Sequence, residues 1–310
     1  MSTIVLLTAY NGEKQLPALL ESLRTQTDPD FTVLWQDDGS IDGTAELLKQ
    51  VSREDPRFQP GAEQRKHLGP AGNFLSLIRQ ADADRLLCCD QDDIWEPEKI
   101  AVLKRVMQEA ESEYGAEMPI LVHSDCSLID EMGNQVGKSF FAHQGWDPKA
   151  VTLPRLLVQN NVTGCTLIMN RPLRNLIAAH ARAKDLFMHD WFIALTAAAF
   201  GRIVFVRQPL TRYRQHEENA IGASKQTLPA RALKAFGQRD KAKRRILLTY
   251  THTLVFRRLY QDTLPPEALT LVDAYLATRT KKKIPRVIAV RRLGCTMQSP
   301  ITRMGQILFG

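Results

Sequence analysis

The sequence contains few cysteines, and their number and spacing argue against two kinds of site. There are five, an odd number, and no two are separated by the two residues typical of a zinc-binding pair. A disulfide framework, which stabilises short secreted chains, is equally unexpected in a chain of this length. We therefore expect buried, reduced thiols, with the adjacent Cys88 and Cys89 on opposite faces of one strand.

Long apolar runs are missing as well. No stretch approaches the roughly 18 uninterrupted apolar residues of a membrane span, and the N-terminus lacks a basic-then-apolar secretion signal. These absences predict a cytoplasmic protein. At 310 residues, the chain has room for one large α/β domain with an appendage, or for two domains.

Acidic residues are scarce in the last part of the chain. Residues 225–310 hold four Asp and Glu against 18 Lys and Arg, whereas residues 1–224 hold 30 against 23. This division predicts a body over residues 1–224 and a basic, mainly helical region over residues 225–310. Such a region fits the anionic inner face of the cell membrane, where each Lys or Arg contributes about 1 kcal/mol, with a protein partner as the alternative. Nucleic acid is not expected, because no basic stretch is interleaved with aromatic residues.

Strands and helices alternate at the start of the chain. Thr3–Thr8 and Phe31–Trp35 are short runs rich in β-branched and aromatic residues, which predict strands. Apolar residues at helical spacing follow each of them, from Gln15 to Thr25 and again around Leu48. A β-α-β-α order predicts parallel strands covered by helices.

Carboxylates gather where two of these strands end. The apolar run Leu86–Cys89 stops at Asp90, Asp92 and Asp93, and an earlier strand stops at Asp37-Asp38. Like charges this close repel, and Mg²⁺ or Mn²⁺ is a suitable counter-charge that leaves coordination sites for substrate phosphates. A solvated acidic turn would explain one such cluster. It explains two poorly, because strand ends of a parallel sheet share the edge at which ligands bind.

Later segments are more ambiguous. Asp190 opens a strongly apolar helix, where capping and catalysis are both open interpretations. Asp125 follows the predicted strand Ile120–His123, so it should end that strand on the same side of the sheet. Residues 137–145 have turn formers and aromatics without a period, which predicts a loop.

Taken together, three motifs make the pattern specific: Thr8-Ala9-Tyr10-Asn11-Gly12, Asp37-Asp38-Gly39-Ser40-Ile41-Asp42-Gly43-Thr44 and Asp90-Gln91-Asp92-Asp93. In this order they resemble family 2 glycosyltransferases with the GT-A fold, over about two thirds of the chain. The resemblance implies an α/β fold with a Rossmann-like mixed sheet flanked by helices, followed here by the basic helical C-terminal extension. It also implies an inverting, metal-dependent glycosyltransferase.

The resemblance assigns expected roles to individual residues. Asp190 is implied to be the general base, with Asp125 as the alternative. The metal, Mg²⁺ or Mn²⁺, is expected at Asp92 and His216, the latter from a Tyr-Arg-x-His string. Residues expected to contact the donor nucleotide are Thr8, Tyr10, Asn11, Asp38, Asn73 and Asp90. Residues expected near the donor or acceptor sugar are Asn161, Gly164, Trp191 and Arg214.

Substrates follow from the finer resemblance. Asp-Gln-Asp-Asp-Ile-Trp together with Tyr-Arg-x-His resembles rhamnosyltransferase-like enzymes of bacterial surface polysaccharide assembly. This favours dTDP-rhamnose as donor, with UDP-sugars as the alternative, and a glycan or lipid-linked glycan as acceptor. A metal-dependent phosphohydrolase is a rival class, but it gives the Asp37-Asp38 strand end no role. A non-catalytic module that binds sugar nucleotides or membranes is the other rival.

Overall fold

The structure, a computed structural model, describes residues 1–62, 67–215 and 239–309. The chain divides into two units, which we call the sheet unit and the helical unit. The sheet unit comprises Met1–Phe140 and Val162–His216, and the helical unit comprises Phe141–Asn161 and Glu217–Gly310. The helical unit therefore includes a segment of the acidic body as well as the basic C-terminal region.

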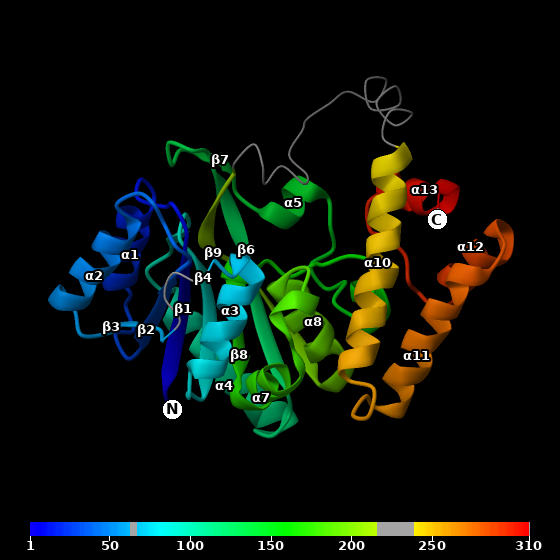
Figure 1. The fold of residues 1–310 in the computed structure, drawn as a ribbon, viewed down its shortest axis with the longest axis horizontal. Coiled ribbons are helices and arrows are strands. Elements are labelled where there is room, and N and C mark those ends of the chain that lie inside the picture. Colours follow the sequence, from blue (N-terminus) through cyan, green and yellow to red (C-terminus); the bar gives the residue numbers. More distant parts are fainter. Residues whose placement is uncertain (63–66, 216–238, 310) are drawn as a thin grey trace. The chain divides into compact units, whose positions relative to one another are not determined.

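The first half of the sheet is parallel, as the alternation of strands and helices predicts. Strands β1 (Thr3–Ala9), β2 (Thr32–Asp37), β3 (Phe58–Pro60) and β4 (Arg85–Asp90) lie in the order β3-β2-β1-β4, and every pairing among them is parallel. The intervening helices are α1 (Leu16–Arg24), α2 (Thr44–Glu54) and α3 (Gly69–Gln80) (Figure 1).

The second half makes the sheet mixed, which confirms the expected fold class. Strand β8 (Leu167–Asn170) lies antiparallel between β4 and β6 (Ile120–Ile129). Beyond β6 lie β9 (Arg202–Arg214), parallel to β6, and the short β5 (Ile94–Trp95), antiparallel to β9. Strand β7 (Gln135–Gly137) pairs with β6. Helices of this half are α4 (Lys99–Tyr114), α7 (Arg171–His180) and α8 (His189–Phe200).

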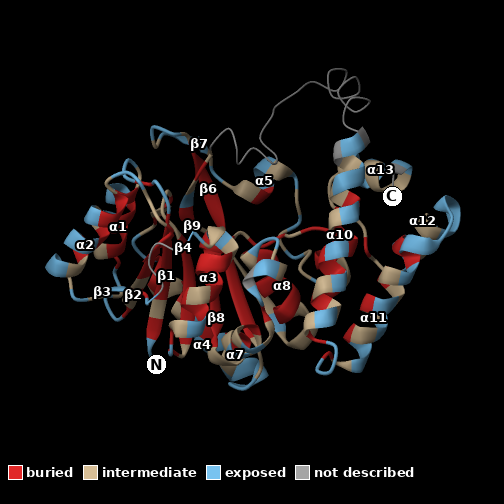
Figure 2. Ribbon diagram, viewed as in Figure 1, coloured by how far each residue is buried: buried red, intermediate tan, exposed pale blue. Residues whose placement is uncertain are grey.

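The centre of the sheet is the core of its unit. Residues Leu86–Cys89 of β4 and Val5–Leu7 of β1 have no exposed surface, and the buried colour of Figure 2 runs along the central strands. All five cysteines are free and buried, which confirms the expectation of reduced thiols. Burial raises the pKa of the Cys88 and Cys89 thiols well above the usual value, so both remain protonated.

The helical unit contains α10 (Arg239–Leu259), α11 (Pro266–Ala277), α12 (Lys283–Arg292) and α13 (Pro300–Phe309), together with the short α6 (Leu153–Leu156). From residue 239 to residue 309, which the structure describes, the C-terminal region is thus mainly helical, as expected. Residues 137–145 correct the loop prediction, since the short helix α5 (Phe140–Gln144) forms within them. Among the described residues, no helix combines the length and apolar character needed to cross a membrane.

Candidate active site

Three strand ends meet at one edge of the sheet. In the parallel register, Thr8 of β1 lies opposite Gln36 of β2 on one side and Asp90 of β4 on the other. Ala9 lies opposite Asp37. The loops that follow these strands therefore start side by side, which confirms that the carboxylates of both acidic motifs share an edge.

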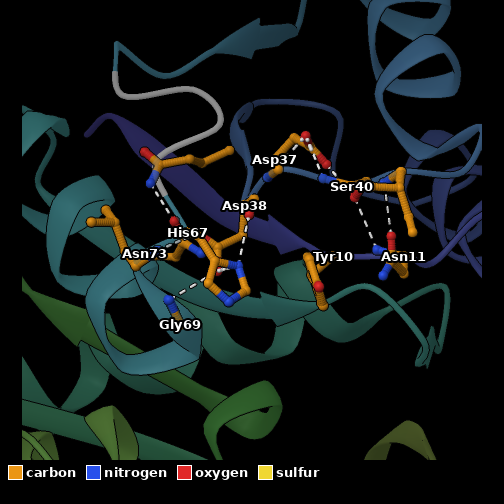
Figure 3. A network of polar contacts seen from close by, with 12 residues as sticks. Tyr10, Asn11, Asp37, Asp38, Ser40, His67, Gly69 and Asn73 are labelled. Carbon is orange, nitrogen blue, oxygen red and sulfur yellow. Dashed lines mark hydrogen bonds and ion pairs between the residues drawn. The ribbon is translucent and has the colours of Figure 1, made fainter.

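Two polar side chains tie these loops together. Gln91 bonds the backbone of Tyr10 twice: its amide oxygen accepts from the Tyr10 N–H (2.6 Å) and its amide nitrogen donates to the Tyr10 carbonyl (2.8 Å). Asn11, with a positive φ of 49°, accepts from the Ile41 N–H at 3.0 Å, and its own N–H donates to the Ser40 hydroxyl at 2.9 Å (Figure 3). Gln91 is not among the predicted site residues, and its position inside the acidic motif was the available signal.

Asp38 organises the nearby loop before α3. Its buried carboxylate accepts the N–H groups of Leu68 (2.5 Å), the N-cap of α3, and of Gly69 (2.8 Å), the first helical residue, so it holds the start of this helix in place. His67 lies 3.8 Å from the same carboxylate, and its ring packs at 5.2 Å from that of Tyr10 (Figure 3). Tyr10 is 44% exposed, so an aromatic face remains open at the edge of the sheet, as stacking against a base would require.

Asn73 lies on α3 behind this loop. It is buried, and its amide oxygen accepts a hydrogen bond from the Gln36 side chain. Its contact with a nucleotide stays a prediction, as does that of Thr8, whose side chain is largely buried.

The strand end of β4 concentrates negative charge. Asp90 is partly exposed and Asp93 is fully buried. Burial, with the charges of Asp93, Asp92 and Asp190, raises the pKa of Asp90 well above its usual value. Burial and the charge of Asp92 raise the pKa of Asp93 to about 7. Asp190 is therefore close enough to the acidic motif to act on it electrostatically.

These residues fit a hard divalent cation through their carboxylates. Ligand atoms of Asp90, Asp93 and Cys165 lie within 4.8 Å of one another, and Oδ2 of Asp93 has no hydrogen-bond partner. Burial raises the pKa of the Cys165 thiol well above its usual value, so the oxygens are the better ligands for Mg²⁺ or Mn²⁺. Asp92 is partly exposed and is not in this group, so its ligand role stays a prediction. The other predicted ligand, His216, lies outside the described residues.

Arg214 supports the acidic loop from β9. Its guanidinium donates to the carbonyls of Asp92 (2.8 Å), Asp130 (3.0 Å) and Glu131 (2.8 Å), while its N–H donates to the Asp93 carboxylate. The residue is 4% exposed. This geometry fixes the backbone of the loop, and the expected contact between Arg214 and a sugar stays a prediction.

Asp190 lies in the first turn of α8 without being its N-cap. The N-cap is Met188, which makes no side-chain capping bond. The buried carboxylate of Asp190 accepts from the N–H of the buried Trp191 at 2.6 Å. Neighbouring His189 stacks on Phe74 with ring centres 3.9 Å apart, and burial lowers its pKa to about 3. His189 is thus a neutral packing residue beside the predicted base.

Gly164 packs directly against this turn. A Cβ on Gly164 would lie 2.7 Å from Nε2 of His189 and 3.5 Å from Cβ of Asp190, so only glycine allows the approach. Asn161 belongs to the helical unit, where its amide donates to the Asp147 carbonyl (2.9 Å) and accepts from Gln298 (2.7 Å). Contacts of Gly164, Asn161 and Trp191 with a sugar stay predictions.

The structure corrects the expectation that a strand ends at Asp125. Strand β6 continues to Ile129, with irregular register around Asp125. The carboxylate accepts from the Ser139 hydroxyl (2.5 Å) and from the N–H groups of Cys126 and Phe140. Because these bonds occupy it, Asp125 is a weaker candidate for a general base than Asp190.

A mixed α/β sheet with this acidic edge is the architecture of GT-A glycosyltransferases. The chain belongs to glycosyl transferase family 2, whose sequence model matches residues 4–170, and it is therefore a glycosyltransferase. Similar curated proteins include the dTDP-rhamnosyl transferase RfbG of Shigella flexneri, 26% identical over 70% of this chain and 74% of the relative. The putative glycosyltransferase EpsH of Bacillus subtilis is 25% identical over 70% of this chain, but the match spans only 62% of that protein.

Solved structures show the same fold at low sequence identity. S. aureus TarS 1–349 in complex with UDP-GlcNAc has a TM-score of 0.57 at 16% identity, covering 94% of this chain and 80% of that one. A longer TarS structure gives 0.58 at 16% identity, with 99% of this chain matching 52% of it. The mannosyltransferase PcManGT from Pyrobaculum calidifontis, in complex with GDP-Man and Mn²⁺, has a TM-score of 0.54 at 15% identity, covering 94% and 72%.

Proposed function

We propose that this glycosyltransferase transfers a sugar from a nucleotide sugar, with inversion, to a glycan or lipid-linked glycan acceptor in bacterial surface polysaccharide synthesis. The first candidate donor is dTDP-rhamnose, supported by the likeness to RfbG. UDP-sugars are the alternative. The observation that carries the proposal is the meeting of the loops after β1, β2 and β4 at one edge, with Asp190 near enough to Asp90 to help raise its pKa.

The donor nucleotide would lie along this edge. Tyr10 offers an exposed aromatic face, and Asp38 fixes the neighbouring loop through two backbone N–H groups. Asp90 is partly exposed at the adjacent strand end, where a ribose hydroxyl could donate to it. In this arrangement Tyr10 and Asp38 would contact the base and Asp90 the ribose.

Asp190 is the proposed general base. Its carboxylate would take the proton of the acceptor hydroxyl as that oxygen attacks C1 of the donor sugar, and the nucleoside diphosphate would depart. One carboxylate oxygen accepts from the N–H of Trp191, which fixes the group on the first turn of a rigid helix.

Metal dependence is part of the proposal. Carboxylates of the acidic motif would hold the ion: Asp90 and Asp93, whose ligand atoms lie close together, and the predicted ligand Asp92, with His216 as the further predicted ligand. A bound Mg²⁺ or Mn²⁺ would stabilise negative charge on the departing diphosphate. Arg214 and Gln91 keep the backbone of this loop in place.

The test is a panel of dTDP- and UDP-sugars incubated with Mn²⁺ and a mixture of lipid-linked and soluble glycans. Release of free nucleoside diphosphate in step with glycan extension would support the proposal, and dTDP-rhamnose is expected to give the highest rate. Binding without release from any donor would favour the non-catalytic module. Faster release from a UDP-sugar would replace the proposed donor.

Association with the inner membrane surface is proposed for the helical unit. Lys281, Lys282 and Lys283 are exposed at the start of α12, and Ile284 and Ile288 of the same helix are 74% and 47% exposed. Residues four apart share a helix face. Exposed apolar side chains beside basic ones fit the interface of an anionic bilayer.

A further inference from the structure

Lys99 occupies a position that folding alone does not favour. It is the first residue of α4, where the helix dipole is unfavourable for a cation, and its side chain is fully buried. Lysine is almost never fully buried unless its charge is paired. The contacts of this side chain should therefore explain why it is there.

The Lys99 ammonium joins three segments of the sheet unit. It donates to the Cys165 carbonyl at 2.5 Å and to the Thr211 hydroxyl at 2.8 Å, and it lies 3.4 Å from the ring centre of Trp95. The Thr211 hydroxyl in turn donates to the Cys165 carbonyl at 3.3 Å. Trp95 ends the acidic segment and pairs with Thr211 across β5 and β9. One buried cation thus connects the acidic segment, β9 and the turn at Cys165.

That turn lies close to the predicted base. Cys165 belongs to the 3₁₀ turn Gly164–Thr166. A Cβ on Gly164 would clash with Nε2 of His189 at 2.7 Å and would lie 3.5 Å from Cβ of Asp190. A displacement of the Cys165 carbonyl would therefore move the backbone that lies against the first turn of α8. Burial lowers the pKa of Lys99 to about 8 while the charge of Asp93 opposes the shift, so the cation persists at neutral pH.

We propose that Lys99 is a positioning residue: through the Cys165 carbonyl it sets where the Gly164 turn, and hence Asp190, lies relative to the acidic strand end. The inference rests on the proposed role of Asp190. It assigns Lys99 no contact with substrate. A misplacement of about 1 Å in a catalytic group costs on the order of 10²-fold in rate, so a small shift of this turn should be visible in turnover.

The first experiment compares Lys99→Met with Lys104→Met. Methionine preserves length and apolar packing but removes the charge and both hydrogen bonds. Lys104 lies on the same helix and bridges to Asp28 at 2.8 Å instead, so its variant controls for loss of a lysine from α4. We expect kcat of Lys99→Met to fall on the order of 10²-fold with KM for the donor within about threefold. Lys104→Met should match the wild type.

A second variant reaches the same turn without touching Lys99. Gly164→Ala introduces the clash with His189, so it should also lower kcat with little change in donor KM. If Lys99→Met does not fold, Gly164→Ala still tests whether the position of this turn affects turnover. Normal kcat in both variants, or a loss confined to KM, would overturn it.

A third measurement does not need activity. Hydrogen exchange of Lys99→Met should be faster than in the wild type at the amides of residues 164–166 and of Trp191 and Phe192, and unchanged in α1. Unchanged exchange at the turn and at α8 would contradict the positioning role. If the wild type turned over no donor, the proposed function would fail, and this exchange pattern would still decide whether Lys99 holds the turn.

Discussion

At the scale of single residues, Asp190 has a structural role and a proposed catalytic role, and one substitution separates them. Its carboxylate accepts the Trp191 N–H in the first turn of α8, and it is the proposed base. Asn can accept the same hydrogen bond, so Asp190→Asn should lose only the interaction of the charge with the helix N-terminus, about 0.3–1 kcal/mol of stability. Asn cannot take up a proton, so turnover should fall by about 10²-fold or more. Melting temperature and turnover are measured together.

The controls for this prediction are donor affinity and Asp125→Asn. Donor affinity should be unchanged in Asp190→Asn, because the base faces the acceptor. Asp125 is occupied by Ser139 and backbone N–H groups, so Asp125→Asn should retain most turnover. If instead Asp190→Asn were active and Asp125→Asn inactive, the roles of the two residues would be exchanged.

Asp38 also combines capping with an expected ligand contact. Removing its carboxylate in Asp38→Ala should cost about 1 kcal/mol of stability, because the Leu68 and Gly69 N–H groups lose their acceptor. Donor affinity, measured by calorimetry with dTDP and UDP, should fall more than turnover at saturating donor. Asp42 is a matched control, since its carboxylate accepts from the N–H and hydroxyl of Thr44 at the start of α2. Similar affinities for nucleotide in Asp38→Ala and Asp42→Ala would argue against a base contact.

At the scale of elements, α12 carries the membrane prediction. Reversing Lys281, Lys282 and Lys283 to Glu should weaken binding to vesicles of phosphatidylglycerol and phosphatidylcholine and make it less sensitive to salt. Turnover of a water-soluble acceptor should persist. The control variant reverses the exposed Lys14, Lys49 and Arg53 of the sheet unit to Glu. It changes the net charge by the same amount as the α12 variant. It should bind vesicles more strongly than the α12 variant. Equal binding by the two variants would favour a protein partner or a structural role for this helix.

Helix α10 carries a pH-dependent prediction. His252 is 3% exposed, and burial lowers its pKa to about 4. The unfolded chain takes up a proton near pH 6.5 while the folded chain does not. The free energy of unfolding should therefore fall between pH 6.5 and pH 4 by about 1.4 kcal/mol per pH unit. His252→Gln should remove this part of the pH dependence, whereas His143→Gln, at an exposed position, should leave it in place. If the free energy of unfolding had the same slope with pH in the wild type and in His252→Gln, the prediction would be wrong.

Sequence patterns predicted the elements whose signals are local. The parallel half of the sheet follows from strands and helices that alternate with clear periodicity, and the shared acidic edge follows from parallel register. The antiparallel half was not predictable in this way. Two-residue β5 pairs with β9, more than a hundred residues later, and such pairing depends on tertiary packing rather than on local pattern.

The site shows the same division. The order of the motifs predicted Asp38, Asp90 and Asp92 as site residues. No local pattern distinguished Lys99 from a surface lysine, because its partners Cys165 and Thr211 are distant in sequence. Asn161 and Gly164 are three residues apart in the sequence, and both are expected near a sugar, yet they belong to different units. Only the fold separates them.

At the scale of the whole molecule, nucleotide binding and metal binding should appear as coupled stabilisation. A ligand that binds only the folded chain stabilises it by about 2.7 kcal/mol at 100 times its Kd. With Mn²⁺ present, dTDP should raise the melting temperature, and a purine diphosphate should raise it less because the base site is expected to fit a pyrimidine. EDTA should remove most of the effect, since the acidic strand end would then meet the diphosphate with uncompensated negative charge.

Asp92→Ala should reproduce the effect of EDTA while leaving the melting temperature of the free protein close to that of the wild type, because Asp92 is partly exposed rather than part of the core. Mn²⁺ alone, measured in parallel, separates metal binding from nucleotide binding. Stabilisation by dTDP that is equal in EDTA and in Mn²⁺ would remove the metal from the proposed site while leaving the nucleotide there.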